Sequence, residues 1–426
     1  MLAVRLSRAG RPAVQLRRLL VAAAAGGTGF LLLCTLGHAL GHPGDAGGSA
    51  LRLAWCLVPV AATVQFAVAV ARTDPGTLPR PGLSAIGLGP ARLMAISATT
   101  TALATTLGSM LALLFFLHLR GDLNGMPFDG AAAESLAAGL PLPLPAALTL
   151  LAVVPLIASL ATALVLRPGE RGAVGRAALS RFRIRRTAER PETTEAPPAP
   201  TAPPERAAPR ERAAAPPAAE LPVPTGLPWG VAVLAAGLAV EAYATRVAPG
   251  GAAATLPGGL RAGPVGVLIG WTLTAVGLAL AGPGLTHLCG RLLQTVRPGA
   301  LRLLAGRVLM AESGRIGRPL GVVCAVASAA FATAALHGPG GADEPVFGPL
   351  TTLGALLVAG CALATLATAA VEARHARADT TAALLRLGAP ATTLRGAAAL
   401  RAGALLALFG PLTLLVAHLA AQPLLR

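Results

Sequence analysis

The sequence predicts an all-α protein that crosses a membrane with about nine helices. Three observations carry this prediction. Hydrophobic residues make up 54% of the chain and charged residues only 12%, whereas soluble globular proteins carry about 25% charge. The mean hydropathy is +0.67. Several apolar stretches reach about 20 residues, the length at which a helix crosses a hydrocarbon core of about 30 Å. These features exclude an ordinary soluble globular protein.

Runs free of charge locate the individual spans. We expect them at about 19–40, 53–71, 93–118, 143–166, 227–245, 264–283, 319–337, 349–371 and 396–421. If the N-terminus is cytoplasmic, 30 of the 35 basic residues, all of them arginine, fall on the cytoplasmic side. Because cytoplasmic loops of membrane proteins are enriched in Lys and Arg, this distribution predicts a cytoplasmic N-terminus and an external C-terminus.

The net charge of +17 indicates anionic membrane lipids rather than nucleic acid as the charge partner, because the arginines flank the spans. The chain contains no lysine, so it cannot form the G-x-x-x-x-G-K-[ST] phosphate loop of an ATPase. None of the five cysteines forms a C-x-x-C pair, and no catalytic triad or paired-carboxylate pattern stands out. We therefore expect no enzyme activity, cofactor or metal in this chain.

Composition divides the chain into four parts. Residues 1–166 form a first half with four spans, and 167–226 are a Pro-, Ala- and Arg-rich linker that cannot bury a core. Residues 227–283 hold two intervening spans. Residues 284–426 form a second half, which consists of an amphipathic cytoplasmic segment and three spans. We expect that segment, up to about residue 318, to form one or two helices on the inner leaflet.

The two halves resemble each other at an offset of about 299–300 residues. Arg17 and Arg18 precede the first span as Arg315 and Arg318 precede the seventh, and Gly89 matches Gly388. The matched spans run in the same direction, which predicts two parallel pseudo-repeats related by an axis along the membrane normal. The second half lacks a match for the fourth span.

The loop after the second span of each half carries the most specific motif. In the second half, charged residues precede the phrase A-A-L-L-R-L-G-A at 382–389, and a further arginine follows it. The residues concerned are Glu372, Arg374, Arg377, Leu384, Leu385, Arg386, Gly388 and Arg395. The leucines give a short helix an apolar face that a partner's groove accepts, and the glycine is suited to end that helix in a left-handed conformation. The first half keeps only a degenerate version, with Arg80, Leu88, Gly89 and Arg92.

This loop resembles the FtsX-like (MacB-type) ABC transporter permease family, whose signature here is a charged stretch, then A-L-L-R-A-L-G-A, then an arginine and a long apolar helix. The resemblance implies a permease subunit of a bacterial plasma membrane exporter that moves or extracts a peptide, lipid or lipoprotein. ATP would bind to separate ABC subunits that dock on both loops. The family's sizeable external domain has no counterpart among the short outer loops of this chain.

Two alternative functions remain open at this point. The degenerate motif of the first half and the short outer loops favour a member of this family that no longer transports and serves as a membrane scaffold or regulator. A proton-coupled carrier would instead require Glu241, the only carboxylate within a predicted span, to face a cavity. Because Glu241 lies near the outer end of its span beside Tyr243 and Arg246, the simpler prediction is a side chain that reaches the interface.

Overall fold

The computed structural model is built almost entirely from long helices. It describes residues 12–74, 90–123, 130–133, 136–167, 226–247, 254–255, 261–262, 265–295, 299–336 and 348–422. The chain divides into two units, one of 1–166 with 223–426 and the other of 167–222. Apart from Arg167, the second unit, which holds most of the expected linker, lies outside the described residues. All helices below belong to the first unit.

The helices of the described part confirm an all-α, multi-pass membrane protein. Nine segments are long and apolar enough to cross a membrane. The helices are α2 (Pro12–Gly41), α3 (Ala46–Trp55), α4 (Leu57–Thr73), α6 (Pro90–Arg120), α7 (Leu144–Leu166), α9 (Leu227–Val247), α10 (Val265–Thr295), α11 (Ala300–Leu336), α12 (Pro349–Ala376), α13 (Ala378–Arg386) and α14 (Ala391–Ala421). Two short strands, β1 (Ala254–Thr255) and β2 (Arg261–Ala262), pair antiparallel. Helices suit this environment because they satisfy every backbone hydrogen bond within the segment.

The segment between the sixth and seventh spans differs from the expectation. Instead of separate helices on the inner leaflet, its residues extend α10 to Thr295 and begin α11 at Ala300. The two extensions pack on each other because both carry glycine at the contact: a Cβ on Gly306 would lie 2.5 Å from the carbonyl oxygen of Gly290. The described arginines of this segment therefore lie on two closely packed helices.

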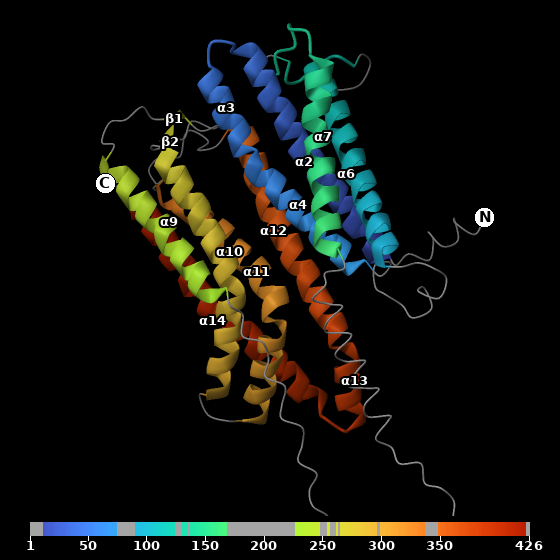
Figure 1. Cartoon of the computed structure of the whole chain (residues 1–426), viewed down its shortest axis with the longest axis vertical. Coiled ribbons are helices and arrows are strands. Elements are labelled where there is room, and N and C mark those ends of the chain that lie inside the picture. Colours follow the sequence, from blue (N-terminus) through green and yellow to red (C-terminus); the bar gives the residue numbers. More distant parts are fainter. Residues whose placement is uncertain are drawn as a thin grey trace, which may run out of the picture. The chain divides into compact units, whose positions relative to one another are not determined.

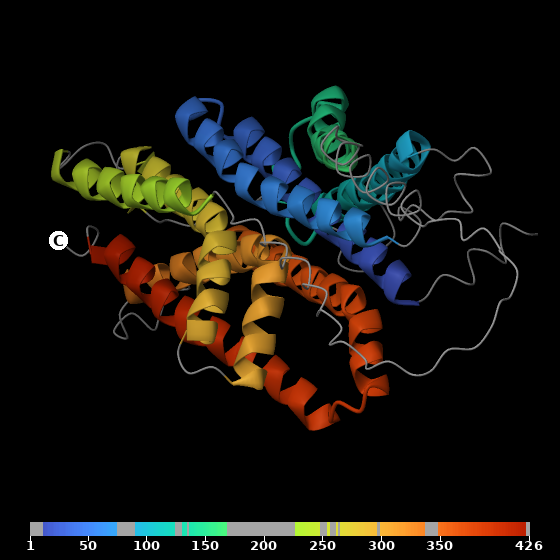
Figure 2. The ribbon, with the colours of Figure 1, turned by 60° about the horizontal axis from the view of Figure 1, so that its bottom comes forward.

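The helices form two groups joined through α12. Helices α2, α4, α6 and α7 pack on one another and form the first group. In the second group, α10 packs on both α9 and α11, and α11 also packs on α14. Helix α12 contacts α2 and α4 on one side and α11 on the other (Figures 1 and 2). One hydrophobic cluster joins α12 to the first group, because it includes Phe66 of α4, Ala158 of α7 and Cys361 of α12. We call the end of the helices where α2 begins and α12 ends the arginine-rich end.

The contact between α4 and α12 brings matching positions of the two predicted repeats together. The Thr63 hydroxyl lies 3.9 Å from the Cys361 sulfur, and these residues are 298 apart in the sequence. Trp55, the last residue of α3, lies just before α4, and its ring covers Gly354, 299 residues later, so closely that a Cβ there would overlap it. Matching residues meet each other at a twofold interface. The α4–α12 contact therefore has the character of a pseudo-twofold axis.

The packing within each half supports the same relation. Helix α2 packs on α6 as α11 packs on α14. The buried residues Ser97, Ser109 and Phe116 of α6 are followed, 300 residues later, by buried Ala397, Phe409 and Val416 of α14. Equivalent helices thus bury equivalent faces.

Close packing of α2 on α6 depends on Gly108. A Cβ on this residue would overlap the carbonyl oxygen of Ala22, whereas a Cβ on Gly403 of α14 would meet no atom within 4 Å. We expect Gly108→Ala to destabilise the fold by about 1–3 kcal/mol, the range for overpacking, and Gly403→Ala to have no such effect. Thermal unfolding of the purified protein in detergent measures the difference. Equal melting temperatures for both variants would contradict the described α2–α6 packing.

Candidate functional site

The short helix predicted around residues 382–389 is present as α13, between the end of α12 and the start of α14. It begins directly after Arg377, and Asp379 lies in its first turn, where a negative charge favours the helix dipole. At the other end Gly388 adopts a positive φ of +85°. The amide of Gly388 donates to the Leu385 carbonyl and that of Ala389 to the Leu384 carbonyl, both at 3.0 Å. This pair of bonds is a Schellman motif, and it confirms the expected glycine cap.

The surface of α13 is apolar at its C-terminal end and charged around it. Leu385 is 48% exposed and Leu387 84% exposed, whereas Leu384 is half-buried. Arg374 in the last turn of α12, Arg386 in the last turn of α13 and Arg395 near the start of α14 are exposed. No residue of α13 is buried. Helix α13 is therefore held mainly by its two ends, with two leucines available for contact.

Arg377 holds the first end of α13 to α11. Its guanidinium lies 3.0 Å from a carboxylate oxygen of Glu312, which is only 7% exposed. This pairing within the chain was not predicted from the sequence. Glu312 was missed, although it is the only carboxylate between residues 285 and 318. Charge-assisted bonds of this kind are among the stronger polar contacts in proteins.

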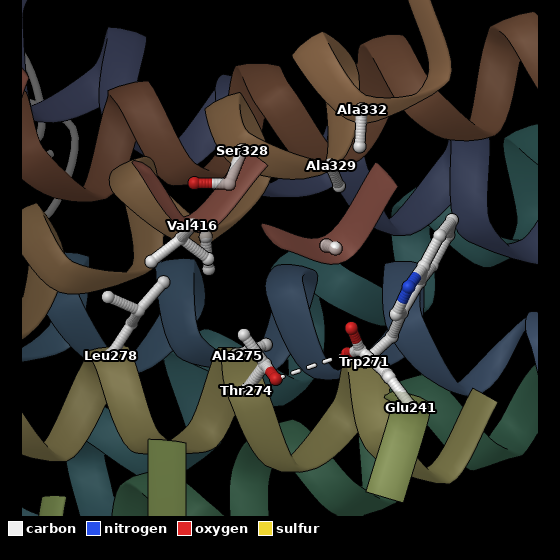
Figure 3. A pocket seen from close by; sticks show the side chains of 11 residues that line it. Glu241, Trp271, Thr274, Ala275, Leu278, Ser328, Ala329, Ala332 and Val416 are labelled. Atoms are coloured by element: carbon white, nitrogen blue, oxygen red, sulfur yellow. Dashed lines mark hydrogen bonds between the residues drawn. The ribbon is translucent and has the colours of Figure 1, made fainter. Parts of the chain in front are cut away.

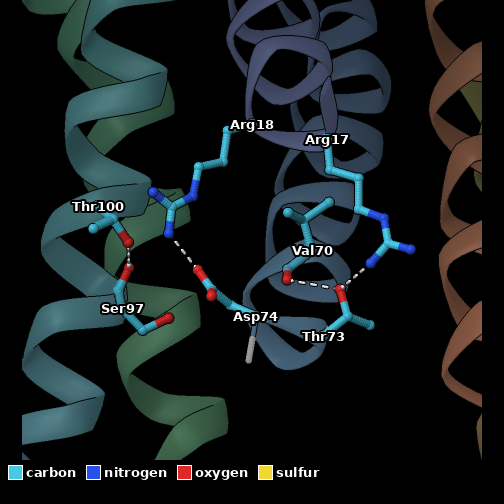
Figure 4. A network of polar contacts seen from close by, with 7 residues as sticks. All are labelled: Arg17, Arg18, Val70, Thr73, Asp74, Ser97 and Thr100. Carbon is cyan, nitrogen blue, oxygen red and sulfur yellow. Dashed lines mark hydrogen bonds and ion pairs between the residues drawn. The ribbon is translucent and has the colours of Figure 1, made fainter. Parts of the chain in front are cut away.

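Glu372 forms a second, more exposed ion pair, at 3.8 Å from Arg315 of α11. The first half contains its counterpart: Arg18 of α2 pairs with Asp74 at the end of α4 at 2.5 Å (Figure 4). Arg315 follows Arg18 by 297 residues, and Glu372 follows Asp74 by 298. Arg17 adds a bond to the Thr73 hydroxyl at 3.2 Å. Each half thus links the start of its first span to the end of its second.

The loop that carries the degenerate motif of the first half is described only in part. Arg80, Leu88 and Gly89 lie outside the described residues. Arg92 lies in the first turn of α6 and is exposed, as Arg395 is near the start of α14. The structure therefore brings together the second-half residues that the motif predicted, and it places one residue of the first-half set.

Glu241 does not reach the interface. Its side chain is 1% exposed and accepts a hydrogen bond at 3.2 Å from the Thr274 hydroxyl of α10. The reason is the packing of α9 on α10 through glycines: a Cβ on Gly270 would overlap the Glu241 side chain. Tyr243, which is 68% exposed, faces the opposite way. The predicted interfacial position of Glu241 is therefore wrong.

Glu241 lines a cavity of about 70 Å³ between α9, α10, α11 and α14 (Figure 3). Trp271, Thr274, Ala275 and Leu278 line it from α10, Ser328, Ala329 and Ala332 from α11, and Val416 and Ala420 from α14. The α10 residues were not predicted, although their i, i+3, i+4, i+7 spacing places them on one helix face. The indole Nε1 of Trp271 has no hydrogen-bond acceptor among the described residues.

No family model matches the chain, and neither a curated protein nor a solved structure is significantly similar to it. Within the described ranges, no three His, Cys, Asp or Glu residues gather in a group that could hold a metal ion. Helix α13 and the Glu241 cavity are therefore the two candidate functional sites.

The Glu312–Arg377 pair should hold α13 in place. In Arg377→Ala we expect amide hydrogen exchange across 378–386 to accelerate at least about tenfold, equivalent to about 1.4 kcal/mol. Arg315→Ala is the matched control, because it removes the exposed pair with Glu372, and exposed pairs contribute only about 0–1 kcal/mol. Hydrogen-exchange mass spectrometry in detergent compares the two variants. Unchanged exchange in Arg377→Ala would show that this pair does not anchor α13.

Proposed function

We propose that the chain is the permease subunit of an ABC-type exporter of the FtsX-like class, and that a separate ATP-binding subunit docks on α13. The observation that carries this proposal is the exposure of Leu385 on α13 and of Leu387 at its C-cap, at the arginine-rich end. An exposed leucine pair rimmed by arginines suits a partner groove that is apolar with an acidic edge. The motif resemblance of the same residues supports the identity of that partner.

The connections of α13 suit the transmission of movement. Arg377 ties its start to α11 through Glu312, and the Schellman motif leads directly into α14. A partner that displaces α13 would therefore act on two helices of the second half. We propose that ATP binding on the partner moves the two halves as rigid bodies about the α4–α12 contact.

The same proposal says which side of the membrane the arginine-rich end faces and what that end contacts. The arginine-rich end faces the cytoplasm of a bacterial cell, where an ATPase and anionic lipids are available. Exposed Arg92, Arg374, Arg386 and Arg395 surround this end and would contact lipid phosphates or the partner's acids. The transported substrate would be a peptide, a lipid or a lipoprotein.

A proton-coupled carrier is a second candidate, because the condition that it requires is met: Glu241 lines a cavity within the membrane-spanning helices. Buried carboxylates in such positions serve in proton relays of transporters. Under this alternative, substrate uptake into proteoliposomes would follow an imposed proton gradient without ATP, and Glu241→Gln would abolish it.

Docking on α13 can be tested with the tagged protein from its native membranes. We expect an ABC ATP-binding subunit to co-purify in mild detergent and to be identified by mass spectrometry. Its yield should fall at least about tenfold in the double variant Leu385→Ala/Leu387→Ala, because the apolar contact is lost.

The matched control is Leu292→Ala/Leu303→Ala. It removes two similarly exposed leucines from α10 and α11 at the same end of the molecule and should leave the yield unchanged. If no ATP-binding subunit co-purifies under conditions that preserve other membrane complexes, the permease proposal is wrong. Equal loss in both double variants would exclude α13 as the docking site.

A further inference from the structure

We infer that the Glu241 cavity binds the ammonium group of a cationic amphiphile, whose apolar chain leaves the cavity towards the hydrocarbon core. This inference goes beyond the proposed function, because it concerns what the membrane domain binds and holds whether ATP or protons drive transport. The cavity lies among α9, α10, α11 and α14, away from α13.

The charge of the lining selects a cation. Among the described residues that line the cavity, Glu241 is the only one with an ionisable side chain. Burying a charged carboxylate among membrane-spanning helices is costly unless an opposite charge accompanies it. An ammonium group at the carboxylate offsets part of that cost, since opposite charges interact strongly where water is scarce. An anionic or neutral headgroup gains no such interaction.

The carboxylate is positioned before any ligand arrives. Thr274 donates to its Oε1 atom from α10, and the close approach of α9 at Gly270 restricts the side chain. Figure 3 shows the carboxylate on the α10 side of the space, with Ser328 and Ala329 across from it on α11. Because the site is ordered in advance, little entropy is lost when a ligand binds.

The size and surface of the cavity fit an alkylammonium. A volume of about 70 Å³ exceeds the 10–15 Å³ or so that one water needs in comparable cavities, so the space accepts an ammonium group and its first methylenes. Leu278, Ala325 and Ala332 give the lining an apolar surface. Ala329 lines the cavity and is itself exposed, so the cavity opens beside it and an alkyl chain can pass out there.

The inference is tested by equilibrium binding of radiolabelled dodecylammonium to the full chain. The chain is embedded in phosphatidylcholine nanodiscs, and no ATPase is present. Empty nanodiscs supply the background, and dodecanol supplies a neutral probe with the same chain. We expect saturable binding of one dodecylammonium per chain and no saturable binding of dodecanol. Because no partner is present, failure here is independent of the docking experiment on α13.

Two variants assign the binding to this cavity. Glu241→Gln keeps the shape and the bond from Thr274 but removes the charge, and it should weaken dodecylammonium binding at least about tenfold. Ala329→Leu fills the mouth from an exposed position and leaves the carboxylate intact, so it tests the site even if Glu241→Gln fails to fold. It should lower the affinity to a similar extent. Equal binding of the amine and the alcohol, or full affinity in Ala329→Leu or in a folded Glu241→Gln, would overturn the inference.

The ammonium group could belong to a membrane lipid or to a free amphiphile. Nanodiscs in which phosphatidylethanolamine replaces part of the phosphatidylcholine distinguish these sources. Competition by phosphatidylethanolamine would support the site and identify a lipid headgroup as its occupant. Undiminished binding of dodecylammonium would support the site and identify a free cationic amphiphile.

Discussion

The contact of α4 with α12 is the constraint on which the rest of the structure depends. Here Thr63 meets Cys361, and Trp55 at the end of α3 covers Gly354, so that matching positions of the two halves touch each other. The small residue Gly354 lets the chains approach closely at this contact. Close van der Waals packing of this kind helps helices to associate in membranes. Because α12 also contacts α11, the same interface positions the second half and, through its arginine-rich end, α13.

Helices α11 and α14 connect the two sites that we propose. Helix α11 carries Glu312, which anchors α13, and Ser328, which lines the cavity. At a rise of about 1.5 Å per residue these positions lie roughly 24 Å apart on one helix. Helix α14 begins directly after the cap of α13 and contributes Val416 to the cavity. A movement of α13 would therefore reach the cavity through two continuous helices.

The membrane-spanning helices of the described part followed from the sequence, because the length of an apolar run reflects the thickness of the hydrocarbon core. The motif at 382–389 also predicted α13 and its cap at Gly388, since both features are local. Three features depended on tertiary contacts and were not predictable in this way. Glu241 turns inward because Gly270 lies opposite it, residues 284–318 extend two helices because Gly290 and Gly306 meet, and Arg377 is neutralised by Glu312 from a distant part of the chain.

A disulfide across the α4–α12 contact tests the pseudo-twofold arrangement most directly. Thr63→Cys places a thiol opposite the natural Cys361, and a protease site inserted within 167–222 allows the chain to be cut between its halves after oxidation. We expect the two fragments to remain joined on a non-reducing gel, and to separate after reduction or when Cys361→Ser is added. Fragments that separate in the oxidised Thr63→Cys protein would contradict the proposed interface and the movement of the two halves about it.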